Sequence, residues 1–235
     1  MTSGPQASSG HRPRQPARVA RALALAEIRP SKLGAVRSAR LSSGERELYF
    51  WILRHFATSG RPSGTETREE AVRLGLEIEG AFAALQREDL VHRAPDGAIT
   101  VAYPFSGTPT AHRVRFPDGH EVSAMCAIDA LGIAPMFDER VEITSRDPLT
   151  GEEIAVDLAP DGAGGCVPEE AVALCGASGR GTSSASCCPF LNFFTSTANA
   201  ERWLAAYPDV QGSVISLPDA IVAGRAVFGD ILKEA

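Results

Sequence analysis

Cys126 and Asp129 are two residues of complementary chemistry that lie three positions apart. On a helix, residues i and i+3 share one face, with Cβ atoms roughly 5–6 Å apart. If a helix begins near Ala124–Cys126, the partial positive charge of its N-terminus favours a thiolate over a thiol. A thiolate is a soft nucleophile, and a carboxyl group can donate a proton. The spacing therefore predicts a nucleophile–acid pair, with a buried cysteine and a dipole-complementing aspartate as the alternative.

A second feature is the adjacent pair Cys187 and Cys188, which precedes Pro189 and a phenylalanine-rich run. Pro189 favours extended geometry at Cys188, and the aromatic residues predict a dry wall beside the thiols. Thiolates select soft metal ions over magnesium, calcium or manganese. The pattern predicts either one arm of a soft-metal site or an inert piece of the core.

The chain holds five cysteines, which are Cys126, Cys166, Cys175, Cys187 and Cys188. It has no C-x2-C pair and no H-x3–5-H pair, so a zinc site lacks its usual ligand spacing. It also lacks G-x-G-x-x-G, Walker A and G-x-S-x-G motifs. The cysteines are predicted to be reduced thiols of a cytosolic protein. Cys166 and Cys175 are predicted to be structural.

The composition of the 235 residues is that of a globular protein, with 44% hydrophobic and 22% charged residues and a net charge of −6. No apolar run approaches the ~18 residues of a transmembrane helix, and the N-terminus has no secretory pattern. These features predict a cytoplasmic protein without membrane contact. Residues 1–40 hold eight Lys/Arg against one Glu, which predicts a basic, partly disordered leader.

The elements that must position the cysteines begin with residues 41–105, which predict a winged-helix-like domain. Three helices are expected from Ser42 to Leu90, and a β-hairpin that turns at Asp96-Gly97 follows them. The first two helices are predicted to begin with the capping boxes Ser42–Glu45 and Thr67–Glu70. The third helix carries Arg87 as its only base among acidic residues, and such a helix repels phosphate. Nucleic acid is therefore not expected as a partner.

Residues 106–235 predict a catalytic domain with a small mixed or antiparallel sheet and flanking helices. A short helix from Cys126 to Leu131 is expected to close at Gly132 and Pro135. Strand patterns are expected near residues 114–116, 121–122, 141–144, 154–158 and 172–174, and helices near 200–206 and 217–232. The predicted fold class is α+β.

Two segments together resemble the organomercurial (alkylmercury) lyases. Residues 125–131 (MCAIDAL) resemble the C-A-x-D-x-L segment of that family, and residues 188–196 (CPFLNFFTS) resemble its C-x4-F-F-x-S segment. The resemblance extends over about residues 43–232, in the same order of elements. It implies a winged-helix-like domain ahead of a catalytic core.

The resemblance implies protonolysis of a carbon–mercury bond, which gives a hydrocarbon and Hg(II). Its catalytic set corresponds to Cys126, Asp129 and Cys188, because Cys188 lies five residues before Phe193. Cys187 is left as a neighbour with a spare coordination role. The thiolates would bind mercury, and Asp129 would accept a thiol proton and pass it to carbon. No organic cofactor is implied; external thiols, or a mercuric reductase as partner, would remove Hg(II).

The sequence also departs from the family pattern. Met125 stands where several members have an aromatic residue, and Arg146-Asp147 stands where some carry an extra cysteine. Two further hypotheses therefore stay open. One is a soft-metal-binding or metal-responsive regulatory protein without lyase turnover. The other is a thiol–disulfide oxidoreductase that uses Cys187–Cys188 or Cys126–Cys188, although the chain lacks C-x-x-C.

Overall fold

Helices and paired strands make up most of the computed structural model, which describes residues 16–179 and 182–234. The helices are α1 (Ala17–Leu25), η1 (Pro30–Lys32), α2 (Gly34–Ser38), α3 (Ser43–Ser59), α4 (Gly64–Arg73), α5 (Ile78–Arg87), α6 (Ala127–Phe137), α7 (Ser183–Ser186), η2 (Cys188–Phe190), α8 (Thr197–Ala205), α9 (Leu217–Phe228) and η3 (Ile231–Glu234). The strands are β1 (Val91–Arg93), β2 (Ile99–Ala102), β3 (Phe105–Ser106), β4 (His112–Arg115), β5 (Glu121–Ala124), β6 (Val141–Arg146), β7 (Glu153–Leu158), β8 (Gly164–Val167), β9 (Val172–Ala177), β10 (Leu191–Phe194) and β11 (Gln211–Ser216).

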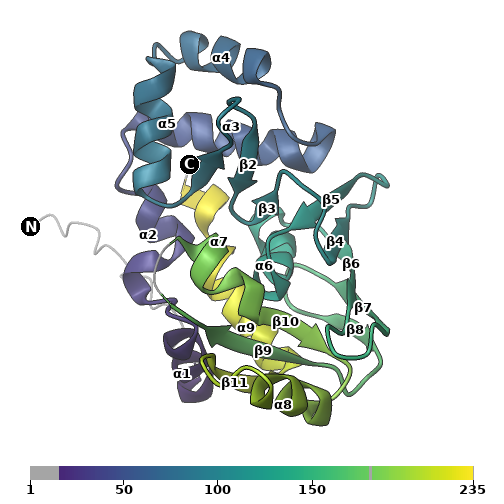
Figure 1. The fold of residues 1–235 in the computed structure, drawn as a ribbon. Helices are drawn as coiled ribbons and strands as arrows, with labels where there is room; N and C mark the ends of the chain where they lie inside the picture. Colours follow the sequence, from purple (N-terminus) through teal and green to yellow (C-terminus); the bar gives the residue numbers. More distant parts are fainter. Residues whose placement is uncertain (1–15, 180–181, 235) are drawn as a thin grey trace, which may run out of the picture.

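The strands form two antiparallel sheets (Figure 1). The larger has eight strands in the order β1-β2-β3-β5-β4-β6-β7-β8, and the smaller has the order β10-β9-β11. Strand β6 alternates buried and exposed residues because one of its faces meets the core. The α+β class is confirmed, but the expectation of a single small sheet is wrong. Strands β10 and β11 were not predicted, because an aromatic run and a Gly/Ser-rich run carry no alternation.

The first large helix begins as predicted, at the capping box of Ser42 and Glu45. The second capping box is formed by Ser63 and Glu66, and the predicted box at Thr67 is wrong. Thr67 lies inside α4, where its hydroxyl donates to the Ser63 carbonyl. The β1–β2 hairpin continues into the eight-stranded sheet, and the predicted boundary between residues 105 and 106 falls within β3. One hydrophobic core therefore runs through both parts of the chain.

Helices α6 and α9 pack closely against each other at the centre of the molecule (Figure 1). The expected end of α6 at Gly132 and Pro135 is wrong, because the helix continues to Phe137. A Cβ on Gly132 would lie 2.6 Å from a ring carbon of Phe228, so glycine permits the close approach of the two helices. Packing against α9 thus outweighs the local cost of glycine and proline within a helix.

The described part of the basic leader is helical and packed. Helix α1 lies against β9 and β11, with Val19, Ala22 and Leu23 buried, and α2 packs on α9 and η3. Residues 1–15 lie outside the described residues. In the described part of the chain, no helix is long and apolar enough to cross a membrane.

The contact between α6 and α9 predicts opposite effects for two helical glycines. Gly132→Ala should lower the free energy of unfolding by about 1–3 kcal/mol, because the added methyl overpacks the interface with Phe228. Gly64→Ala, in α4, meets nothing within 4 Å, so it should keep or raise that free energy by up to ~1 kcal/mol. Urea denaturation followed by tryptophan fluorescence measures both. Equal effects of the two variants would contradict this packing.

Candidate active site

The N-terminus of α6 brings Cys126 and Asp129 together, as their spacing predicted. Strand β5 ends at Ala124, and Cys126 is the extended N-cap residue of the helix. The Cys126 thiol donates a hydrogen bond to Asp129 Oδ2 over 2.7 Å, and the Asp129 backbone N–H donates to Cys126 Sγ over 3.4 Å. The carboxyl group therefore lies within proton-transfer distance of the sulfur.

Cys188 reaches the same point from η2, just before β10. Its Sγ lies 3.8 Å from Asp129 Oδ2 and 4.0 Å from the Tyr103 hydroxyl. The ligand atoms of Cys126, Asp129 and Cys188 all lie within 4.8 Å of one another, and all three residues are buried. Among the described residues this is the one cluster of three or more His, Cys, Asp or Glu that could hold a metal ion.

The other cysteines lie outside this cluster. Cys187 lines the same cavity, but its thiol donates to the Ser183 carbonyl over 3.4 Å. Cys166 is half-buried on β8, and Cys175 is buried on β9. All five cysteines are free thiols. The structure therefore brings together the two cysteines that the family resemblance selects.

Burial controls the ionisation of the cluster. It raises the pKa of Asp129 to about 7, although hydrogen bonds from the two thiols lower that pKa. It raises the pKa of Cys126 to about 12. Hydrogen bonding to Cys126, together with burial, raises the pKa of Cys188 well above its usual value. The helix N-terminus does favour a thiolate at Cys126 through the backbone N–H of Asp129, but burial has the larger effect on the pKa of Cys126 and favours the thiol.

A partly buried polar network, which sequence reasoning missed, holds the N-terminus of α7, just ahead of Cys188. Ser183 donates its hydroxyl to Asp89 Oδ2 over 2.7 Å and its backbone N–H over 3.2 Å. Arg37 donates to the Asp89 carbonyl over 2.8 Å, and His92 Nε2 lies 2.7 Å from Asp89 Oδ1. Burial raises the pKa of Asp89, but the bonds from His92 and Ser183 and the charge of Arg37 bring it below its usual value.

The network matters because α7 leads directly into the two adjacent cysteines. It joins the leader, the connection from α5 to β1, and α7, three segments that are far apart in the sequence. No motif connects these three segments, and that is why the sequence alone does not reveal the network.

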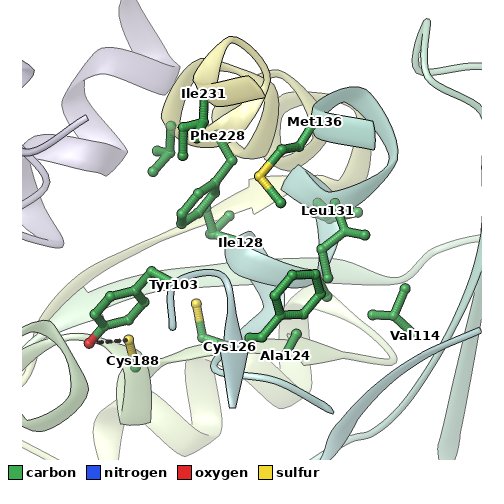
Figure 2. Close-up of a cluster of buried hydrophobic side chains, with 14 of the residues drawn as sticks. Tyr103, Val114, Ala124, Cys126, Ile128, Leu131, Met136, Cys188, Phe228 and Ile231 are labelled. Atoms are coloured by element: carbon green, nitrogen blue, oxygen red, sulfur yellow. Dashed lines mark hydrogen bonds between the residues drawn. The ribbon is translucent and has the colours of Figure 1, made fainter. Parts of the chain in front are cut away.

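A cavity of about 40 Å³ adjoins the cluster. Its walls are mostly apolar and include Leu90, Ile128 and Phe228. Figure 2 shows Cys126, Cys188 and Tyr103 within the buried cluster, with Ile128 and Phe228 beside them. Burial raises the pKa of Tyr103, so its hydroxyl stays neutral beside Cys188.

Two thiols and one carboxyl group in a mostly apolar cavity define a class of site, one that binds a soft metal and can supply a proton to the group that the metal carries. The alkylmercury lyase (MerB) family profile matches residues 105–229. The alkylmercury lyase of Staphylococcus epidermidis is 28% identical over 199 residues, which cover 83% of this chain and 89% of that protein. That of Bacillus cereus is 32% identical over 156 residues, which cover 66% of this chain and 70% of that protein.

The fold agrees with these matches. The crystal structure of the mercury-bound form of MerB2 superposes with a TM-score of 0.68 at 21% identity, and the match covers 86% of this chain and 98% of that one. This chain belongs to the alkylmercury lyase family.

The raised pKa of Asp129 predicts a pH dependence of stability. Its pKa is about 7 in the folded chain and about 3.8 without burial, so the folded state holds the proton more tightly. The stability that protonated Asp129 contributes to the folded state is complete below pH 3.8 and is lost as pH rises through 7. Between pH 5 and 7, the free energy of unfolding of the wild type should therefore fall by roughly 2 kcal/mol relative to Asp129→Asn. Chemical denaturation across this range measures the difference, and parallel profiles would contradict it.

Proposed function

We propose that Cys126, Asp129 and Cys188 carry out the carbon–mercury cleavage that defines the family, by protonolysis. The observation that carries the proposal is the buried cluster in which the three ligand atoms lie within 4.8 Å. Mercury is soft and binds thiolate in preference to harder ligands. A carboxyl group at 2.7 Å from one sulfur can deliver a proton next to that metal.

The reaction begins with thiol exchange. An organomercurial arrives bound to an external thiol, and Cys188 replaces that thiol, which leaves with the proton of Cys188. Cys126 then binds the same mercury, and its proton passes to ionised Asp129 over the existing hydrogen bond. Coordination by two sulfurs weakens the carbon–mercury bond. The order in which the two cysteines bind is part of the proposal.

Asp129 completes the reaction. Its proton moves to the carbon as the carbon–mercury bond breaks, which gives a hydrocarbon, Hg(II) on two thiolates and an ionised carboxylate. A pKa of about 7 suits this role, because the group can both accept and release a proton near neutral pH. External thiols would then remove Hg(II), and no organic cofactor takes part. A mercuric reductase is the proposed recipient of the product.

In this proposal, the parts of the chain around the three-residue cluster support it. Residues 41–105 would be a winged-helix-like support and residues 106–235 the catalytic part, and the described helices α1 and α2 of the leader (residues 1–40) pack against the catalytic part. The thiols must stay reduced, so we place the protein in the cytoplasm. A soft-metal-binding protein without turnover is the second candidate, because the same three groups would retain Hg(II).

Substitution of single cysteines tests these assignments. Cys126→Ser and Cys188→Ser should each abolish release of hydrocarbon from methylmercury in the presence of excess thiol, because each removes one sulfur ligand. Cys187→Ser is the matched control for the adjacent position, and Cys166→Ser and Cys175→Ser are controls elsewhere in the fold. These three should retain turnover. Headspace gas chromatography measures the hydrocarbon, and full activity in Cys188→Ser would transfer the role to Cys187.

A further inference from the structure

The outer wall of the active-site cavity comes from the leader. Ile28, Lys32, Gly34 and Arg37 all line the cavity, together with residues of the catalytic part. They lie outside residues 105–229, which the family profile matches. The size of the cavity therefore depends on a segment that does not contribute to the cysteine–aspartate cluster.

This wall is fixed at both ends. At Gly34 the backbone lies so close to η3 that an added Cβ would be 2.2 Å from a side-chain carbon of Ile231. Arg37, which is buried, donates to the Asp89 carbonyl over 2.8 Å. At the other end, the Ile28 backbone N–H donates to the carbonyl of Leu23 over 2.8 Å, and Leu23 belongs to α1, which packs against β9 and β11. The wall cannot move outward without breaking these contacts. Ile28 is part of this wall, and its side chain packs against the core.

The space that remains is small and apolar. The cavity measures about 40 Å³, whereas a cavity of roughly 150 Å³ holds a benzene ring and a single water needs roughly 10–15 Å³. Ile28, Ile128 and Phe228 line the same cavity as Cys126, Asp129 and Cys188, and Figure 2 shows Phe228 next to Ile128. An organic group on mercury held by Cys126 and Cys188 would therefore have to share this cavity with the three side chains.

We propose that this wall makes the chain selective for mercurials with a small alkyl group, methyl or ethyl, over those with an aryl group, and that Ile28 is the residue that sets the limit. A methyl group fills such a space and contacts apolar carbon on several sides. A phenyl ring would have to displace the wall at Gly34 or Arg37. The inference rests on the proposed lyase function and names its substrate class.

Competition between methylmercury and phenylmercury, at equal concentration with excess thiol, tests this inference. Methane and benzene in the headspace give the ratio of kcat/KM for the two substrates. The wild type should favour methylmercury at least tenfold. Ile28→Ala should shift the ratio at least fivefold towards phenylmercury, because the shorter side chain widens the cavity. Ile28→Val should shift it in the same direction by less, and it serves as the milder variant if Ile28→Ala fails to fold.

Leu33→Ala is the matched control, because Leu33 is a partly buried apolar residue of the same segment that does not line the cavity. In Leu33→Ala, the ratio of kcat/KM for the two substrates should stay within twofold of the wild-type ratio. Equal use of both substrates by the wild type would overturn the inference, as would an unchanged ratio in both Ile28 variants. Release of neither hydrocarbon by the wild type would instead overturn the lyase function itself, and with it this inference.

Discussion

The burial of two thiols and a carboxyl group in one apolar cavity is the constraint on which the rest of the structure depends. Burial raises the pKa of all three groups, so each group keeps its proton to a higher pH than it would in water. Hydrogen bonds among the three groups replace the hydrogen bonds that they would make with solvent. Burying these polar groups costs free energy before a metal is bound. It becomes favourable when a soft cation displaces the thiol protons, because charge then cancels within the cavity.

The fold supplies what this cluster needs. The close packing of α6 on α9 holds the N-terminus of α6, and with it Cys126 and Asp129, against the core. The polar network around Asp89 holds α7 and so fixes the approach of the chain to Cys188. Each sulfur thus comes from a separately anchored element, and the packing of both elements sets the distance between the two sulfurs. Ile28, Lys32, Gly34 and Arg37 of the leader form a further wall of the cavity.

Local sequence information predicted the site better than it predicted the surroundings. The three-residue spacing of Cys126 and Asp129 is a helix property, so their contact follows from the chain alone. The choice of Cys188 over Cys187 rests on the family motif. In the structure Cys188 lies in the three-residue cluster, whereas the Cys187 thiol donates to the Ser183 carbonyl. The continuation of α6 past Pro135 and the Arg37–Asp89 contact depend on tertiary packing between distant segments. Neither leaves a local signal, so neither could be predicted.

The most direct test of carbon–mercury cleavage by this cluster is a single turnover in heavy water. Stoichiometric methylmercury would be added to the protein in D2O without external thiol, and the headspace gas and the protein would each be analysed by mass spectrometry. The wild type should release one equivalent of singly deuterated methane per protein and retain one Hg(II), whereas Asp129→Ala should retain methylmercury intact. Mercury retention by the wild type without any methane would contradict cleavage of the carbon–mercury bond by this cluster.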